Sequence, residues 1–373
     1  MADFSYRVVA EDPDTNARAG VLTTPHGEIE TPIFMPVGTA ATVKTMKPRE
    51  LEEIGAQIIL ANTYHLFLRP GADLVQKMGG LHGFSRWSGP MLTDSGGFQV
   101  FSQSNLRKIT EKGVQFRSYI DGSKHFMGPE ESIAVQEALG ADIIMAFDEC
   151  TALPAERKQV LASMDRTTRW LKRCIDAKTR DDQALFGIIQ GGVEEDLRKQ
   201  HLEQLLPFDL PGYAIGGLSV GEPPAEMYRI TEAIAPLMPA DKPRYLMGVG
   251  RPQDLVESVS HGVDMFDCVM PSRNARNAHL FTKYGAMRIR NARYKDDPKA
   301  IDENTNCYAS QNFSRAYLRH LFYAKEMLGP ILATMHNLAY YLQLSREMRQ
   351  AIIEGRFAAW RREFYTNQER GIE

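Results

Sequence analysis

The chain of 373 residues is poor in cysteine and has no long hydrophobic run. Its four cysteines are scattered, which excludes a disulfide framework and fits a reducing compartment. No run approaches the roughly 18 apolar residues of a membrane-spanning helix, and the N-terminus has no apolar signal segment. We therefore expect a cytoplasmic protein with no membrane partner.

Net charge is small as well. A balance of −3 excludes a surface coated with positive charge, but it is compatible with a local basic face. Such a face is predicted by one strip that carries seven basic residues and no acidic one: Arg273, Arg276, Lys283, Arg288, Arg290, Arg293 and Lys295. The strip can be an ordinary solvated surface. Because it follows a candidate catalytic carboxylate, Asp267, it favours contacts to phosphates and salt-dependent binding.

One pattern recurs eight times along the chain. A short apolar run ends in small or polar residues, and a helical stretch follows it. Strands that alternate with helices in this way predict an α/β fold, a (β/α)8 TIM barrel, with a doubly wound open sheet as the alternative. The predicted strands are Pro32–Val37, Gln57–Asn62, Met91–Asp94, Asp142–Asp148, Ala184–Gln190, Tyr213–Leu218, Arg244–Val249 and Met265–Met270. The predicted helices are Pro48–Ile54, Pro129–Leu139, Pro154–Lys178, Val193–Leu206, Pro223–Leu237 and Pro252–His261.

Some segments fall outside this repeat. Residues 1–31 are typical of edge strands and turns, and an inserted hairpin is predicted around Asp121-Gly122, with strands Val114–Tyr119 and Lys124–Met127. We expect a barrel formed by residues 1–271 plus 331–373, which include the N-terminal strands and the C-terminal helices. Residues 272–330 would form a small inserted basic subdomain.

Polar residues gather where the predicted strands end. Asp94, Asp148, Gln190 and Asp267 lie at such ends, together with glycine pairs. A lone aspartate there is more often a helix N-cap, but several on one rim of a barrel indicate a site. Two carboxylates without a histidine or cysteine partner suit displacement at an anomeric carbon, in which one attacks C1′ and the other moves a proton. The structural alternative for Asp94 and Asp267 is a buried ion pair with arginine.

A carbohydrate-active hydrolase would use the same two carboxylates. Such enzymes hold sugars on aromatic platforms, and Trp87, Trp170 and Trp360 all fall away from the predicted strand ends. The absence of these platforms argues against a hydrolase.

Six motifs resemble those of the bacterial tRNA-guanine transglycosylases, also called queuine tRNA-ribosyltransferases. They are DSGGFQVFS (94–102), FDEC (147–150), FGIIQGG (186–192), GGLSVGE (216–222), RYLMGVG (244–250) and MFDCVMPSRNARN (265–277). The resemblance runs from about Thr31 to the C-terminal helices. It implies a (β/α)8 barrel with an inserted zinc-binding subdomain. It also implies exchange of the wobble guanine in GUN-anticodon tRNAs (Asp, Asn, His and Tyr acceptors) for a 7-deazaguanine, preQ1, in queuosine biosynthesis.

The resemblance also implies residue roles. Asp267 matches the nucleophile that forms a covalent ribosyl–aspartate intermediate, and Asp94 matches the general acid/base. Arg273 and Arg276 would hold the tRNA. The residues expected to bind the base are Asp148, Gln190, Gly217, Leu218, Phe98, Cys150, Val220, Tyr245 and Met247. From their residue types alone, Met247 and Phe98 are equally compatible with plain core positions.

Substrate choice and assembly follow from the same resemblance. Cys150 and Val220 match the preQ1-using form, and the queuine-using form carries a larger residue and a glycine at these positions. A queuine-salvaging enzyme and a non-catalytic tRNA-binding subunit are the alternatives. The presence of both Asp94 and Asp267 favours an active subunit, and a homodimer is expected.

The chain departs from the family at the structural zinc site. The family's ligands, Cys-x-Cys-x2-Cys and a distant His, correspond here to Thr305, Cys307, Ser310 and His336. Hydroxyls are poor zinc ligands at neutral pH. We therefore expect no cofactor and no metal, with Cys307 and His336 as buried core residues. In place of zinc, packing of Tyr308, Phe313, Tyr317 and Leu318 would hold the subdomain.

Overall fold

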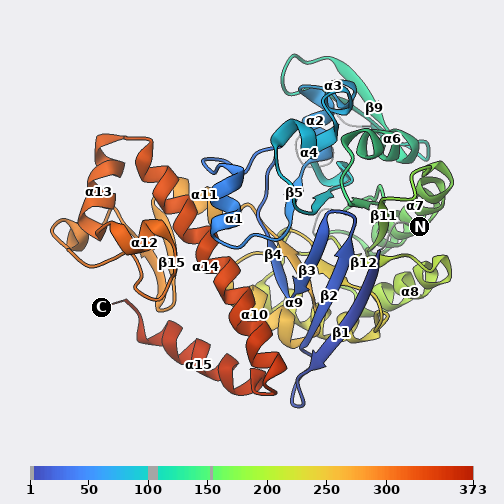
Figure 1. Cartoon of the computed structure of the whole chain (residues 1–373). Coiled ribbons are helices and arrows are strands. Elements are labelled where there is room, and N and C mark those ends of the chain that lie inside the picture. The colour runs from blue at the N-terminus through green and yellow to red at the C-terminus, as the bar shows by residue number, and fades with distance from the viewer. Residues whose placement is uncertain (1–3, 100–107, 152–153, 373) are drawn as a thin grey trace.

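Eight short parallel strands form the centre of the computed structural model, which describes residues 4–99, 108–151 and 154–372 (Figure 1). They pair side by side in the order β4-β14-β13-β12-β11-β10-β6-β5. Every one of the predicted barrel strands is present. Their bounds are β4 (Ile33–Met35), β5 (Ile59–Ala61), β6 (Met91–Thr93), β10 (Ile143–Met145), β11 (Ala184–Ile189), β12 (Gly212–Ile215), β13 (Arg244–Leu246) and β14 (Met265–Asp267).

The first and last strands of this order also meet. Val37 forms a parallel bridge with Leu60. The Gly38 N–H donates to the carbonyl of Leu60 at 2.6 Å, and the Leu60 N–H donates to that of Pro36 at 3.0 Å. The sheet therefore closes on itself as a barrel, which confirms the predicted fold class. The open-sheet alternative is wrong.

Helices follow the strands and cover the barrel, so the strands are buried on both faces and read as continuous apolar runs. Several helices begin at a proline, whose fixed φ suits the first turn, and Gly140 ends α6 with φ +74°. The helices between barrel strands are α1 (Pro48–Glu53), α2 (Thr63–Leu68), α3 (Ala72–Lys77), α4 (Gly80–Ser85), α6 (Pro129–Leu139), α7 (Arg157–Ala177), α8 (Glu195–Leu205), α9 (Pro224–Ile234) and α10 (Pro252–Ser260), with 3-10 turns η1 (Leu206–Phe208) and η2 (Ala235–Leu237).

The last barrel strand is shorter than predicted. It ends at Asp267, and helix α11 (Met270–Arg276) begins where the sequence predicted continuing strand. The reason is Pro271, which has no N–H for a strand ladder and presets a helical φ. Asp267 therefore lies at the carboxyl end of β14, which is the edge where barrel enzymes place their reacting groups.

An antiparallel sheet lies at the opposite end of the barrel. It consists of β1 (Ser5–Glu11), β2 (Arg18–Thr24) and β3 (Gly27–Thr31). The Arg18 guanidinium pairs with Asp264 at 2.6 Å, and the Tyr6 hydroxyl donates to the same carboxylate at 2.9 Å. Because Asp264 lies just before β14, these contacts attach the sheet to the amino ends of the strands and leave the carboxyl ends open.

The predicted hairpin is present between β6 and α6. Its strands are β8 (Val114–Arg117) and β9 (Lys124–Met127), and a short third strand, β7 (Lys108–Ile109), pairs with β8. Within the described residues, no helix has the length and apolar character needed to cross a membrane.

The chain after α11 packs on one long helix, α14 (Leu328–Ile353) (Figure 1). The predicted aromatic core is only partly correct there. Leu318 is buried, but Tyr308 and Tyr317 are 57% and 40% exposed, and their rings pack on half-buried Phe313 at the surface. The proposed division into a barrel and a 272–330 subdomain stays a prediction. The elements are β15 (His279–Thr282), β16 (Gly285–Arg288), η3 (Ala292–Tyr294), α12 (Tyr308–Asn312), α13 (Arg315–Ala324) and, after α14, α15 (Phe357–Arg370).

Candidate active site

A cavity of about 580 Å³ lies at the carboxyl ends of the barrel strands. All predicted site residues except Gln190 line it, and Gln190 lies directly behind Asp148. The lining residues among the predictions are Asp94, Phe98, Asp148, Cys150, Gly217, Leu218, Val220, Tyr245, Met247, Asp267, Arg273 and Arg276. The fold therefore brings together residues that are scattered over most of the sequence.

Asp267 has one engaged oxygen and one free oxygen. Its Oδ1 accepts hydrogen bonds from the Tyr245 hydroxyl at 2.5 Å and from the Gly248 N–H at 2.8 Å. No described residue donates to Oδ2 or forms an ion pair with this carboxylate, so the described residues give no support to the arginine-pair alternative. Burial raises the pKa of Asp267, and the two hydrogen bonds oppose that shift. The arrangement holds the side chain by one oxygen and leaves Oδ2 available to a ligand.

Asp94 follows β6 and is held by four donors. Oδ1 accepts from the N–H groups of Thr63 at 2.8 Å and Gly96 at 3.2 Å, and Oδ2 accepts from the side-chain amides of Asn62 and Gln99. Burial raises the pKa of Asp94 to about 6; the Asn62 and Thr63 hydrogen bonds oppose this, and the charge of Asp267 adds to it. No described arginine pairs with Asp94, so this carboxyl is poised to exchange a proton near neutral pH.

Asp148 and Gln190 form a pair of hydrogen-bonding groups. The Gln190 Nε2 donates to Asp148 Oδ2 at 2.6 Å, and the Ser95 hydroxyl donates to Oδ1 at 3.1 Å. Burial raises the pKa of Asp148 to about 6, against the two side-chain hydrogen bonds. A Cβ at Gly216 would lie 2.8 Å from Gln190 Nε2, and one at Gly217 would clash with Gln190 Oε1. The glycine pair therefore allows the backbone to approach this amide closely.

The rest of the cavity wall combines apolar side chains, a thiol and a loop held by hydrogen bonds. Phe98 is 49% exposed and Met247 is half-buried, so neither is a plain core residue. Burial raises the pKa of the Cys150 thiol to about 12, which keeps it neutral. The Glu222 carboxylate accepts from the N–H groups of Ser219 and Val220, and this fixes the loop that carries Val220 against the cavity.

Two arginines reach the cavity from α11. Arg273 is exposed and Arg276 is half-buried, and they follow Asp267 by six and nine residues. None of the basic residues of the strip forms an ion pair with a carboxylate in the described part of the chain. These charges are therefore available to an anionic ligand.

Comparison with known proteins identifies the family. The model of the family described as queuine tRNA-ribosyltransferase matches residues 12–370. A queuine tRNA-ribosyltransferase of Desulforamulus reducens is 57% identical over 358 residues, which cover 96% of this chain and 97% of that protein. Proteins with the same name from Moorella thermoacetica and Staphylococcus aureus are each 55% identical over 371 and 374 residues, covering 100% of this chain and 100% and 99% of the relatives.

The chain belongs to the queuine tRNA-ribosyltransferase family.

Because the chain belongs to the queuine tRNA-ribosyltransferase family, we examined the four positions that correspond to the family's zinc ligands. Three of the four positions, Cys307, Ser310 and His336, are joined by a chain of hydrogen bonds. Cys307 Sγ donates to Ser310 Oγ at 3.5 Å, Ser310 Oγ lies 2.7 Å from His336 Nδ1, and His336 Nε2 lies 2.8 Å from the Phe281 carbonyl. Since a carbonyl only accepts, Nε2 carries the proton and Nδ1 accepts from Ser310.

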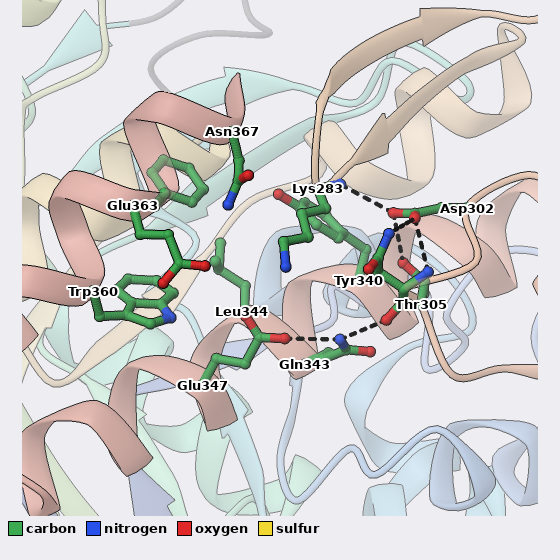
Figure 2. A pocket seen from close by; sticks show the side chains of 12 residues that line it. Lys283, Asp302, Thr305, Tyr340, Gln343, Leu344, Glu347, Trp360, Glu363 and Asn367 are labelled. Carbon is green, nitrogen blue, oxygen red and sulfur yellow. Dashed lines mark hydrogen bonds between the residues drawn. The ribbon is translucent and has the colours of Figure 1, made fainter. Parts of the chain in front are cut away.

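The fourth position, Thr305, is hydrogen-bonded to a different residue. The Thr305 hydroxyl donates to Asp302 Oδ2 at 3.1 Å, beside a small cavity that Asp302, Lys283 and Tyr340 line (Figure 2). One thiol, one imidazole and two hydroxyls are a poor donor set for a structural zinc ion, which usually takes several thiolates.

Another cluster lies at the far end of the barrel. In the described ranges, His26, His82 and Asp142 are the only group of at least three potential metal ligands, with ligand atoms within 4.8 Å. The two imidazoles stack with centroids 3.6 Å apart, and Asp142 accepts from the Met91 N–H at 2.8 Å and contacts His26 Nδ1 at 2.7 Å. Parallel stacked rings do not aim their lone pairs at one ion. This cluster is therefore a set of hydrogen bonds that joins His26 and Met91 to Asp142.

Several residues of the site were missed from the sequence. Asn62 and Gln99 hold Asp94, and they stand at a predicted strand end and inside a motif, where a signal was present. Arg198 contacts two loops of the site from inside α8. A single arginine within a polar helix gave no signal.

Proposed function

We propose that this chain is a tRNA-guanine transglycosylase that exchanges the wobble guanine of GUN-anticodon tRNAs for preQ1. The observation that carries this proposal is the geometry of Asp267, which is held through Oδ1 and presents Oδ2 to a cavity that also contains Asp94 and Asp148. A base must leave its stack before an enzyme reaches C1′, and anticodon loop nucleotides are easily splayed out.

The first half of the reaction forms a covalent intermediate. Asp267 Oδ2 attacks C1′ of the ribose, a new C1′–O bond forms, and the C1′–N9 bond breaks with its electron pair passing to the guanine. Asp94, with a pKa of about 6, supplies a proton to the departing base. The product of this half is a ribosyl ester of Asp267 plus free neutral guanine.

The second half reverses these steps with another base. The incoming 7-deazaguanine loses its N9 proton to the Asp94 carboxylate, and N9 attacks C1′. The ester bond breaks, and its electron pair returns to Asp267. One N-glycosidic bond replaces another, so the exchange needs no ATP and no metal-bound group.

Base recognition uses the pair Asp148 and Gln190. An ionised carboxylate accepts from the N1–H and 2-amino groups of a guanine-type edge, and the second hydrogen of the Gln190 amide can donate to O6. Cys150 and Val220 narrow the wall beside the base, which favours the small aminomethyl group of preQ1 over the cyclopentenediol of queuine.

The tRNA would be held by α11. Arg273 and Arg276 lie beside Asp267 without carboxylate partners among the described residues, so they can contact phosphates that flank the extruded base. The substrates would be the tRNAs for Asp, Asn, His and Tyr in the cytoplasm. A homodimer is also proposed, and the exposed rings of Tyr308 and Tyr317 support a protein contact on that side.

A labelling experiment tests the reaction and the substrate together. The protein is incubated with radiolabelled guanine and a Tyr-accepting tRNA, with unlabelled preQ1 or queuine as competitor. Incorporation blocked by preQ1 but not by queuine supports the proposal. Blocking by queuine favours a salvage enzyme, and no incorporation by the folded protein favours a non-catalytic subunit.

We also propose that no zinc is tightly bound, because the positions Thr305, Cys307, Ser310 and His336 offer one thiol, one imidazole and two hydroxyls, and hydroxyls are poor zinc ligands at neutral pH. Elemental analysis of the purified protein tests this. Less than about 0.1 zinc per chain, with a melting temperature unchanged by a chelator, is expected. One zinc per chain contradicts it.

A further inference from the structure

Helix α8 turns two buried polar side chains toward the site. Arg198 and His201 are both 0% exposed, and they lie three residues apart, on one face of the helix. The His201 Nδ1 accepts a hydrogen bond from the backbone N–H of Gln190 at 2.7 Å. The backbone that carries the Gln190 amide is therefore fixed by α8.

Arg198 donates hydrogen bonds to two separate loops of the site, one after β11 and one after β12. Its Nε donates to the Gly192 carbonyl at 2.7 Å and its Nη1 to the Ile189 carbonyl at 3.1 Å, both at the end of β11. Its Nη2 donates to the Gly217 carbonyl at 3.3 Å, in the loop after β12. One rigid, planar fork of donors therefore sets the distance between the Gln190 loop and the Gly217 loop.

Burial of the Arg198 guanidinium costs free energy that a purely structural side chain at this position would not cost. No described carboxylate forms an ion pair with it, and burial lowers its pKa to about 10, so it remains charged at neutral pH. A buried cation satisfied only by carbonyls is costly to maintain. At Gly191, a Cβ would lie 2.6 Å from Arg198 Cγ, so the loop is closely fitted to this side chain.

The bond to Gly217 has a consequence for the cavity. A trans peptide places its C=O and its N–H on opposite sides. When Arg198 takes the carbonyl of Gly217, the N–H of Leu218 in the same peptide faces the other way, and both residues line the cavity. Gly217 has φ +64°, a conformation that other residues adopt at a cost. Glycine at this position therefore lets the loop adopt the peptide orientation that Arg198 binds.

We propose that Arg198 is a positioning residue for base recognition: it holds the Gly217–Leu218 peptide and the Gln190 loop so that their donors meet one acceptor oxygen of the purine. This inference rests on the proposed function, because it names the groups that the same cavity uses for the base. It assigns Arg198 no contact with the substrate.

The test compares R198Q and R198K with K199A. Lys199 is the next residue on α8 and pairs with Glu195 at 2.7 Å at the surface, which makes it a matched control. Melting temperature and tRNA affinity are measured first, followed by kcat and the KM for guanine and for tRNA. Competition by 2-aminopurine, which lacks the O6 acceptor together with the N1–H, is measured beside competition by guanine.

For R198Q, we expect the KM for guanine to rise about tenfold or more, which is the effect of one lost oriented hydrogen bond, while tRNA affinity stays within about twofold. The advantage of guanine over 2-aminopurine should shrink by the same factor. R198K keeps the charge but lacks the planar fork, so it should fall between R198Q and wild type. K199A should match wild type.

A folded R198Q with an unchanged KM for guanine would overturn the inference. Equal losses for guanine and 2-aminopurine would overturn it too, since they indicate general damage to the cavity. If R198Q does not fold, R198K is judged by the same two criteria. A wild-type protein that exchanges no guanine contradicts the proposed function itself, and that result is recognised before any variant is compared.

Discussion

The Tyr245 hydroxyl donates a 2.5 Å hydrogen bond to Oδ1 of Asp267, across the neighbouring strands β13 and β14. The strand register makes this contact possible, because Tyr245 pairs directly with Met265, two residues before Asp267. The bond selects which carboxylate oxygen stays free. It also stabilises the ionised form of a carboxyl group whose pKa burial would otherwise raise further.

The Y245F variant tests the second effect. Removing a donor from the carboxylate should raise the pKa of Asp267, since a hydrogen bond to a charged group stabilises the ionised form by about 1.5 kcal/mol. More of the nucleophile is then protonated at a given pH. The acid limb of the pH profile of kcat/KM should therefore move to higher pH, while the profile on the alkaline side keeps its shape.

Tyr228 offers a matched control for this experiment. Its hydroxyl donates to Asp254 at 2.6 Å, which is the same kind of bond outside the cavity. Y228F should leave the acid limb where it is in the wild type. If both variants shift the limb equally, or if Y245F does not shift it, Asp267 is not the titrating nucleophile.

The D267N variant tests the covalent step. An amide cannot attack C1′, so guanine exchange should fall by at least roughly ten-thousand-fold, because removal of a catalytic nucleophile can cost up to about a million-fold. A denaturing gel should also lose the protein–tRNA adduct that wild type forms in the absence of a second base. E149Q is the control: Glu149 lies in the loop after β10 but pairs with Arg166 and does not line the cavity. Exchange that persists in D267N excludes the ester intermediate.

The V220G variant tests substrate choice. Val220 lines the cavity, and removal of its isopropyl group widens the wall beside the base. We expect kcat/KM for queuine to rise about tenfold, while that for guanine changes by less than about threefold, because pockets discriminate by such steric differences. Competition of each base against labelled guanine measures both values. Unchanged exclusion of queuine would show that another part of the wall selects the base.

Acid should weaken the region around His336. Burial lowers the pKa of this imidazole in the folded protein, so protonation favours the unfolded chain. Its contribution to stability is complete above the unfolded pKa of about 6.5 and is lost as pH falls below that value. At roughly pH 5.5 the loss reaches up to about 1.4 kcal/mol.

H336Q isolates this contribution, because glutamine does not titrate. Its baseline stability should be lower, since the bonds to Ser310 and Phe281 change. The decrease in unfolding free energy between about pH 7 and pH 5.5, measured by denaturant titration, should nevertheless be smaller than in wild type by up to about 1.4 kcal/mol. Parallel pH curves for the two proteins would contradict the assignment.

Local rules predicted the barrel well because each of its strands is a distinct apolar run. Where a special residue intervened, the rules were less exact. The Met265–Met270 run continued past the true end of β14, because Pro271 begins α11. Apolar character also misled the prediction at Tyr308 and Tyr317, which are exposed although their rings are large. A composition pattern does not reveal which face of a short helix meets the core.

The sequence by itself determined the repeat, the identity of the strand-end acids and the loss of two thiols at the zinc positions. These are properties of residue type and spacing, and the barrel topology places strand ends on one rim. Only the tertiary structure decided the hydrogen bonds between distant residues. The choice of the free oxygen on Asp267, the pairing of Gln190 with Asp148 and the link that Arg198 makes between two loops all depend on side-chain positions set by packing. A buried polar group must find its partner in space, and its position in the chain does not specify that partner.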